Sequence, residues 1–281
     1  MQDTLNTYTL QELYKQPIEP IPWVVEDLLA PGLYFLGGSP KVGKSWLALQ
    51  LCLAVCRGEP FLGFKTKRNE VLYISLEDGP RRLHIRALRM TEKAPAGLHL
   101  CSHAHLIGHG LEQQLDQMLA EHPAVKLVVI DTLQKIREAT SASPSYSIDY
   151  RDASALKAVA DRNDICLLVV HHLRKQEDKD PFKQLSGTNG LSGAADGLFL
   201  IAFTIYCFFS EYQINQMKAI ITITAMVAIG ANRNAIIRAK INTMAMPIGP
   251  IPTKQHIKIA TNAIANIVIN IFICSTCNLQ K

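Results

Sequence analysis

Short apolar runs alternate with longer segments in which apolar residues recur at helical spacing. Four runs predict buried strands, at residues 32–36, 71–75, 126–131 and 165–170, and the first is closed by Gly37-Gly38. Helical spacing predicts four helices, at 44–57, 81–91, 111–121 and 150–163, with Gly58 ending the first. The remaining segments are an extended lead-in at 1–22, an ambiguous stretch at 99–107 and a loop at 138–148.

Strands that alternate with helices predict an α/β fold with a mostly parallel central sheet flanked by helices on both faces. We therefore divide the chain into a lead-in at 1–22, a core domain at 23–200 and an atypical tail at 201–281.

Composition separates the tail from the rest. Residues 1–200 hold 22 basic and 23 acidic side chains, whereas residues 201–281 hold 7 basic side chains and one acid, Glu211. Branched residues change as well, from 32 Leu and 9 Ile to one Leu and 19 Ile. The basic balance of the chain therefore gives no support for nucleic-acid binding by the first 200 residues. We hypothesise that the tail is translated from a shifted or fused reading frame.

The sequence predicts a cytoplasmic protein that does not span a membrane. No basic segment followed by an apolar one opens the chain, and seven cysteines scattered through apolar runs suit a reducing compartment. Uncharged stretches are either too short for a span or interrupted by Asn and Thr. Cys274 and Cys277 form a lone CxxC without a second pair, which is weak evidence for a metal.

The strongest chemical signal matches GxxxxGK[ST] between a predicted strand and a predicted helix. Glycines in such a loop let backbone N–H groups converge on phosphate oxygens. Lys44 is predicted to reach the β- and γ-phosphates of ATP, and the Ser45 hydroxyl to ligate Mg²⁺. The predicted nucleotide-binding residues are Gly38, Ser39, Pro40, Lys41, Val42, Gly43, Lys44, Ser45 and Trp46.

Two acids complete the predicted site. Asp131 ends the buried strand at 126–131, where a carboxylate can hold the water shell of the same Mg²⁺. Glu77 follows the strand at 71–75 and can activate water for attack on the γ-phosphate. The alternative for this acidic pair is an N-cap of the next helix, a role better suited to Asp78.

Histidines give weaker signals. His172, in the pair His171-His172 at a strand end, can sense the γ-phosphate, although such pairs are more often structural. Arg174 or Lys175 could reach a neighbouring subunit's nucleotide. We assign no acidic or cysteine partner to the four histidines between 99 and 109, and alternation in a strand gives the same spacing, so a metal-ligand role for them is disfavoured. The Gly-rich stretch 185–196 suits either a nucleic-acid contact or ordinary helix packing.

Together these residues resemble the RecA-type P-loop ATPases, and within them the RepA-like group of plasmid, phage and mobile-element replication genes. The resemblance covers residues 20–200 and includes Ile74-Ser-Leu-Glu-Asp78, Val129-Ile-Asp-Thr132 and His171-His-Leu-Arg-Lys175. It implies a RecA-like core that assembles into homo-oligomeric rings, usually hexamers, with ATP at subunit boundaries. It also implies Glu77 as catalytic base, His172 as γ-phosphate sensor, and a helicase or DNA-dependent ATPase acting on single-stranded DNA.

The resemblance ends at Ile201, and we assign no arginine finger in the tail. Three alternatives stay open: a nucleotide-dependent regulatory switch without helicase activity, an inactive truncated remnant, and a P-loop small-molecule kinase. The catalytic residues predicted for the ATPase are Lys44, Glu77, Asp131 and His172, with ATP and Mg²⁺ as cofactors.

Overall fold

The computed structural model describes residues 7–17, 19–138, 146–172 and 190–201, and the backbone of further strands within the tail. Its helices are α1 (Leu10–Lys15), α2 (Lys44–Arg57), α3 (Pro80–Met90), α4 (Leu111–Glu121), η1 (Leu133–Lys135), α5 (Tyr146–Asn163) and α7 (Gly190–Ala194). Its strands are β1 (Gly32–Gly38), β2 (Glu70–Ser75), β3 (Leu98–Cys101), β4 (Val125–Asp131), β5 (Cys166–His172), β6 (Gly197–Phe208), β7 (Met217–Ile229), β8 (Met246–Ile248) and β9 (Asn270–Ile273).

The strands form one sheet in the order β3-β2-β4-β5-β1-β6-β7-β8, with β9 paired to β7. The six strands from β3 to β6 are mutually parallel, as predicted, and β7 pairs antiparallel with β6. Strand β1 lies between β5 and β6, so the loop that follows β1 opens beside the ends of these neighbours. Parallel pairing places the carboxyl ends of β1, β2, β4 and β5 at the same edge of the sheet.

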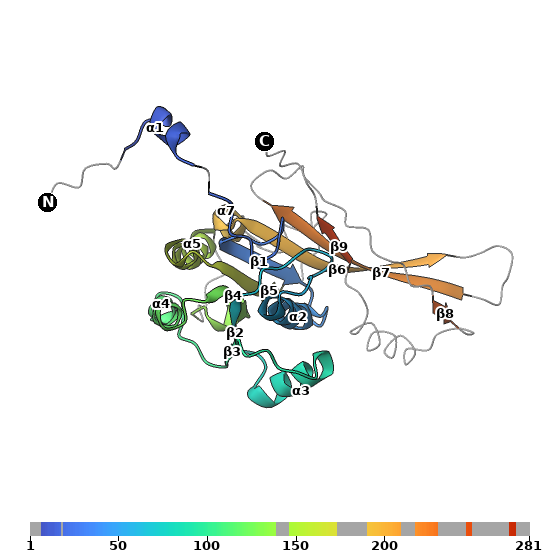
Figure 1. The fold of residues 1–281 in the computed structure, drawn as a ribbon. Helices are drawn as coiled ribbons and strands as arrows, with labels where there is room; N and C mark the ends of the chain where they lie inside the picture. The colour runs from blue at the N-terminus through green and yellow to red at the C-terminus, as the bar shows by residue number, and fades with distance from the viewer. Residues whose placement is uncertain are drawn as a thin grey trace.

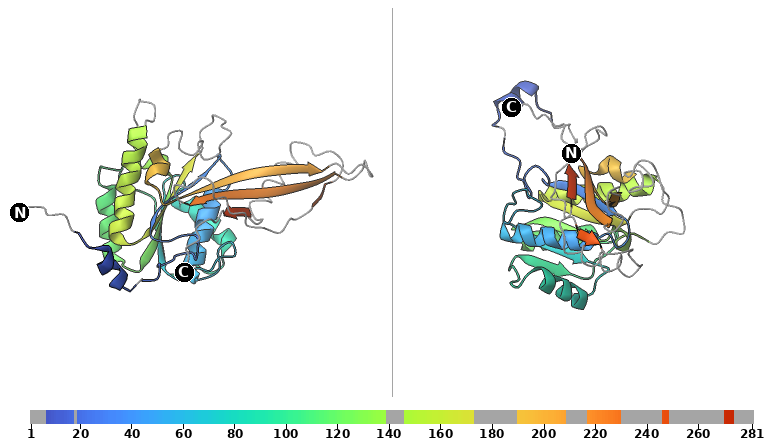
Figure 2. Two further views of the ribbon diagram at one scale, coloured as in Figure 1. Left: turned by 90° about the horizontal axis from the view of Figure 1, so that it is seen from above. Right: turned by 90° about the vertical axis from the view of Figure 1, so that its right-hand side faces the viewer.

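Helices cover both faces of the sheet, as Figures 1 and 2 show. Helix α2 packs on one face in a core that includes Tyr34, Leu36, Val71 and Tyr73. Helices α4, α5 and α7 pack on the opposite face. These strands are nearly continuous apolar runs because both of their faces are buried. Among the helices that the structure describes, none is long and apolar enough to cross a membrane.

Three local predictions were wrong or incomplete. The lead-in is not extended throughout, because Thr9 and Glu12 form a capping box that starts α1. Helix α5 begins at Tyr146, four residues before its predicted start, so the predicted loop at 138–148 is shorter. The ambiguous stretch at 99–107 contains most of β3.

The strand β6 runs across the predicted domain boundary at residue 200. Its first residues pair with β1, where Gly38 lies opposite Ile201, and its later backbone continues alongside β7. Figures 1 and 2 show this pair extending away from the helices. Whether 201–281 forms a separate unit stays a prediction.

Candidate functional site

The loop from Gly38 to Ser45 joins β1 to α2, the context that the sequence predicted. A Cβ at Gly38 would lie 2.8 Å from Cγ1 of Val42 and 2.9 Å from the carbonyl oxygen of Ile201, so this position requires glycine. Gly43 has φ +96° as the N-cap of α2, a conformation that side chains rarely adopt. Ser39, Pro40 and Lys41 lie exposed at the loop's tip, whereas Val42 is buried.

Lys44 is buried in the first turn of α2, with 4% of its surface exposed. Its Nζ donates hydrogen bonds to the carbonyl oxygens of Gly38 (2.8 Å) and Ser39 (2.9 Å). Burial lowers the pKa of Lys44 to about 8, although the charges of Asp131 and Glu77 act in the opposite direction. The loop therefore surrounds the buried amine of Lys44, and a bound phosphate group would stabilise the charged form of this amine.

Asp131 ends β4 and is almost fully buried. The hydroxyl of Tyr73 in β2 donates a hydrogen bond to Oδ2 of Asp131 at 2.9 Å. Burial raises the pKa of Asp131, while the Ser45 hydroxyl and Tyr73 act to lower it. Oδ1 of Asp131 has no hydrogen-bond donor at ordinary distance among the described residues. The Asp131 carboxylate beside the Ser45 hydroxyl is an oxygen donor set of the kind that Mg²⁺ prefers, so the residues present fit the ion.

Glu77 lies two residues beyond β2 and contacts groups that follow or end two other strands. Its Oε1 accepts a hydrogen bond from Oγ1 of Thr132 at 3.2 Å and lies 3.3 Å from Nε2 of His172. The structure thus brings together Glu77 and His172, two predicted site residues that lie 95 positions apart in the sequence. Both side chains are partly exposed, at 39% and 29%, so water can reach the carboxylate.

The N-cap alternative for Asp78 was wrong. Gly79 is the N-cap of α3 and makes no side-chain cap. Asp78 is instead buried and forms ion pairs with Arg82 and Arg86. The guanidinium of Arg86 also lies over the ring of Trp46, 5.5 Å from its centroid. Trp46, predicted among the nucleotide-binding residues, therefore packs toward α3 in this structure.

Three residues around the site were not singled out from the sequence: Tyr73, Thr132 and Gln134. Tyr73 lies in a buried apolar strand, and nothing in that pattern signals a partner 58 residues away. Gln134 Nε2 lies 3.2 Å from Nδ1 of His171, so the first histidine of the pair turns toward η1. The available signal for Thr132 and Gln134 was that both are polar residues soon after Asp131, which ends its strand.

The Gly-rich stretch is described only from residue 190 onward, and there it packs as a helix. A Cβ at Gly190 would lie 2.6 Å from the carbonyl oxygen of Tyr146, so α7 lies directly against α5. Asp196 accepts the backbone N–H of Leu33 and forms an ion pair with Lys157. These contacts favour the packing alternative for residues 190–196. Other candidates lie outside the described residues: Arg174, Lys175, positions 185–189, Cys274 and Cys277.

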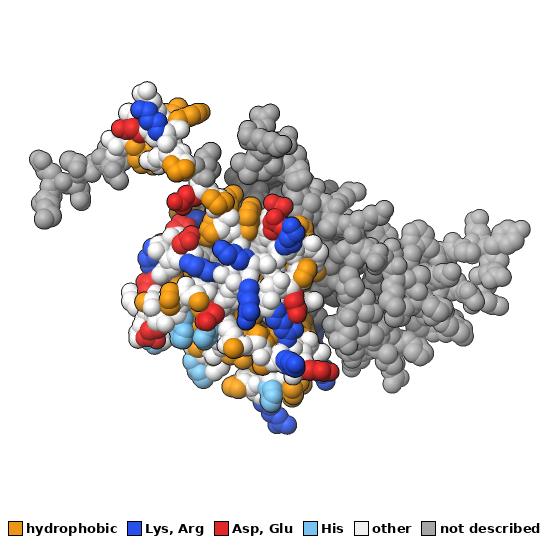
Figure 3. Space-filling view, viewed as in Figure 1, with side chains coloured by type: hydrophobic (Ala, Val, Ile, Leu, Met, Phe, Trp, Pro, Cys, Tyr) orange, Lys and Arg blue, Asp and Glu red, His pale blue; other side chains and the backbone are white. Residues whose placement is uncertain are grey.

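On the described part of the surface seen in Figure 3, no extended region carries one charge. Figure 3 shows Lys and Arg side chains interspersed with acidic and apolar ones on the described part of this face. This mixture agrees with the nearly balanced charge of residues 1–200.

Curated relatives share part of this chain. It is 28% identical over 160 residues to the DNA repair protein RadA of Synechocystis sp., covering 53% of this chain and 30% of the relative. It is 30% identical over 177 residues to the DNA repair protein RadA of Rickettsia felis, covering 62% of this chain and 36% of the relative. The matched region thus spans about a third of the length of these relatives.

Two solved structures are similar in fold. One is a DnaB-like replicative helicase, at 16% identity and a TM-score of 0.47, covering 70% of this chain and 55% of the other. The second is a KaiC-like protein from Pyrococcus horikoshii OT3, at 15% identity and a TM-score of 0.46, covering 71% and 82%.

A family model described as "AAA domain" matches residues 3–178, more than half of the chain. The matched residues include the loop at Gly38–Ser45 and the strand ends that carry Glu77, Asp131 and His172. The chain therefore belongs to the AAA domain family.

Proposed function

We propose that the chain binds ATP with Mg²⁺ and hydrolyses it as a DNA-associated motor or DNA-dependent ATPase. One observation carries the proposal: the contact of Glu77 with Thr132 and His172 at the sheet edge that also holds Lys44 and Asp131. A carboxylate held by hydrogen bonds, near a buried amine and a second acid, is an arrangement suited to phosphoryl transfer to water.

Binding residues come from the loop and from β4. The Lys44 ammonium would exchange the carbonyls of Gly38 and Ser39 for phosphate oxygens, and backbone N–H groups at the start of α2 would add further donors. Ser45 and Asp131 would hold the metal side of the nucleotide. When bound, Mg²⁺–ATP supplies the γ-phosphoryl group together with the charge neutralisation that its transfer requires.

Hydrolysis in this proposal depends on Glu77. Its carboxylate orients a water molecule and accepts a proton from it as the oxygen attacks the γ-phosphorus, while the bond from that phosphorus to the bridging oxygen breaks and ADP leaves. His172 and Thr132 hold the carboxylate in position, and His172 lies where it can link the state of the site to the segment that follows β5. His172 is thus a positioning residue for Glu77.

The DNA-associated role is supported by the relatives, which are named as DNA repair proteins. The resemblance to the RepA-like group supports the more specific proposal of a replicative helicase of a mobile element. In that proposal, the protein assembles as a homo-oligomeric ring, acts on single-stranded DNA and works in the cytoplasm.

The test is ATP hydrolysis by the purified full chain, with and without single-stranded DNA. Lys44→Ala should lose nucleotide binding, whereas Glu77→Gln should bind ATP and hydrolyse it at least about a hundredfold more slowly. Glu26→Gln is the matched control, because Glu26 is an exposed carboxylate that pairs with Lys65 and belongs neither to the loop nor to the strand ends of the site. Turnover without DNA stimulation would favour the regulatory switch, and equal turnover in Glu77→Gln would contradict the proposed base.

A further inference from the structure

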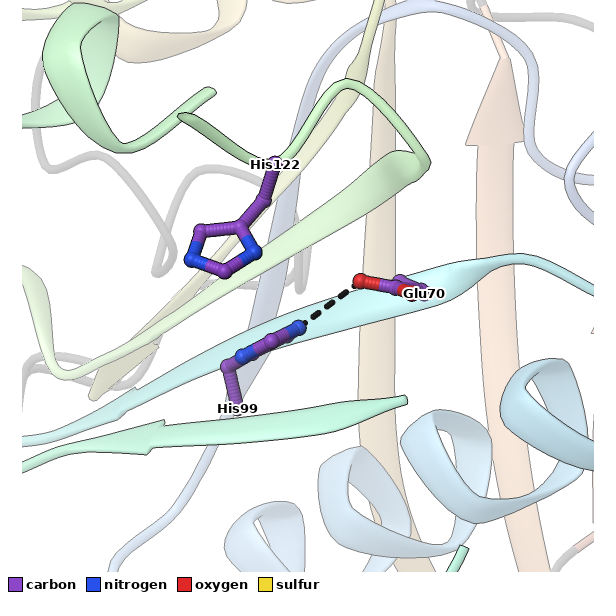
Figure 4. A group of neighbouring side chains, drawn as sticks. All are labelled: Glu70, His99 and His122. Atoms are coloured by element: carbon purple, nitrogen blue, oxygen red, sulfur yellow. Dashed lines mark hydrogen bonds and ion pairs between the residues drawn. The ribbon is translucent and has the colours of Figure 1, made fainter. Parts of the chain in front are cut away.

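A second group of polar side chains lies at the opposite end of β2 from Glu77. Glu70 is the first residue of β2, His99 lies in β3, and His122 is the C-cap of α4. One donor atom from each residue lies within 4.8 Å of those of the other two, and Figure 4 shows the side chains converging from three elements. Within the described part of the chain, this is the group of histidine and acidic residues close enough to share an ion.

Backbone contacts fix the positions of these residues. The N–H of His122 donates to the carbonyl of Met118, and the His122 carbonyl accepts from Val125. The N–H of Glu70 donates to Ala124 in the same turn, at 3.1 Å. A Cβ at Gly97 would lie 3.0 Å from Cγ of Glu70, so the glycine leaves room for this side chain. The residues that carry these donor atoms are therefore held by the pairing of β2 with β3 and by the α4–β4 turn.

The side chains already approach one another as ligands would. Nε2 of His99 lies 2.8 Å from Oε2 of Glu70, and the rings of His99 and His122 are tilted with centroids 4.5 Å apart. Donor atoms around a tetrahedral zinc ion, with bonds of about 2.0–2.2 Å, lie about 3.4 Å apart. Small side-chain rotations would therefore reach this geometry.

We propose that Glu70, His99 and His122 bind a divalent transition-metal ion of the zinc class. Two imidazoles and one carboxylate form a three-ligand set that zinc accepts, with a fourth position for water. The ion would also lie at the C-terminus of α4, where the helix dipole favours a cation. Mg²⁺ prefers oxygen donors, so millimolar magnesium does not compete for this site.

A metal-ligand role for His99 was disfavoured from the sequence because no acidic partner was assigned to it. Glu70 lies 29 residues before His99, and His122 follows a helix. The fold supplies the missing acid through the pairing of β2 with β3. A bound ion would tie β3, the edge strand of the sheet, to β2 and α4. The proposal is independent of ATP hydrolysis, because the site lies at the end of the sheet opposite to the strand ends that hold Glu77 and Asp131.

Zinc binding by the full chain tests the proposal. The protein is purified without a polyhistidine tag, and both Cys274 and Cys277 are changed to serine, because this pair could bind zinc by itself. Isothermal titration with ZnCl₂ in excess MgCl₂ measures affinity and stoichiometry. The variants are His99→Gln and His122→Gln, and the control is His103→Gln, because His103 is exposed and bonded to Ser102 instead. Thermal unfolding without metal reports separately whether each variant folds.

We expect one equivalent of zinc in the parent and in His103→Gln, and at least about tenfold weaker binding in both ligand variants. Co²⁺ should give visible absorption of a tetrahedral site without the near-ultraviolet band of a thiolate ligand. Zinc affinity unchanged in either folded ligand variant would overturn the proposal. So would the absence of stoichiometric binding in the folded parent.

Discussion

The ammonium of Lys44 is buried at the start of α2 with two backbone carbonyls as its hydrogen-bond partners. Its pKa falls to about 8 because burial disfavours the charged form. In the unfolded chain the same amine has an ordinary pKa near 10.5. The folded state therefore bears the cost of holding this charge at neutral pH, and a bound anion would remove that cost.

Lys44→Met should raise the stability of the nucleotide-free protein at pH 7 by about 1 kcal/mol, after the loss of two hydrogen bonds is allowed for. The sign follows from linkage. Between pH 8 and 10.5 the unfolded wild type binds more protons at this site than the folded one, so the cost shrinks as pH rises through that window. The stability difference between variant and wild type should therefore be largest below pH 8.

Urea unfolding of both proteins from pH 7 to 10 measures this difference directly. Comparing the two chains cancels the titration of other groups. A difference that stays constant over this range would show that Lys44 is not buried in its charged form. The same variant should lose the rise in melting temperature that ATP gives to the wild type.

Arg137 joins two elements that lie on either side of residues 139–145. Its Nη1 lies 2.9 Å from Oδ1 of Asp149, and its Nε lies 2.9 Å from Oδ2 of Asp152, both in α5. The two carboxylates are 2% and 5% exposed and the arginine is 18% exposed. This buried cluster fixes the start of α5 against the turn after η1.

Arg137→Ala should destabilise the fold by about 3 kcal/mol, because it removes the cation that two buried carboxylates share, although Asp152 keeps its ion pair with Arg151. Arg162→Ala is the matched control. Arg162 forms a bidentate pair with Asp116, but both side chains are about 40% exposed, and such a surface pair contributes at most about 1 kcal/mol. Chemical unfolding midpoints of the two variants check the contrast, and similar losses in both would contradict it.

At the level of elements, most helices and strands of the core were predicted because the hydrophobic periodicity agrees there with the glycines that end elements. The helix over Lys44–Arg57 and its end at Gly58 are confirmed, and Gly58 has the expected left-handed φ of +69°. Asp78 was misassigned because its side chain contacts arginines one and two turns along α3, a choice that local spacing does not decide. Helix α1 was missed although Thr9 and Glu12 carried its signal.

The candidate site likewise has parts that the local sequence predicts and parts that it does not. The GxxxxGK[ST] loop could be located because its residues are contiguous. The contact between Glu77 and His172 was predictable only as far as parallel strand ends meet at one edge. Tyr73, Gln134 and the group of Glu70, His99 and His122 depend on strand order and register, which no local pattern encodes.

Over the whole molecule, the proposed ATP site is partly exposed at one edge of the sheet. Glu77 and His172 keep 39% and 29% of their side-chain surface accessible. Among the described residues, no arginine forms an ion pair with Glu77 or Asp131. Phosphoryl transfer commonly uses such a cation, often from a neighbouring subunit. An exposed site that lacks this group in its described part is what a subunit-boundary ATPase would present.

The ring assembly proposed above predicts that oligomerisation depends on bound ATP. Glu77→Gln, which keeps ATP unhydrolysed in the proposed mechanism, should shift from monomer to a ring-sized oligomer when Mg²⁺–ATP is added. Lys44→Met should stay in its nucleotide-free state under the same conditions, because it cannot hold the phosphates. Size-exclusion chromatography with light scattering, at several protein concentrations, measures both masses. If Glu77→Gln binds ATP yet stays monomeric at every concentration, the ring proposal fails.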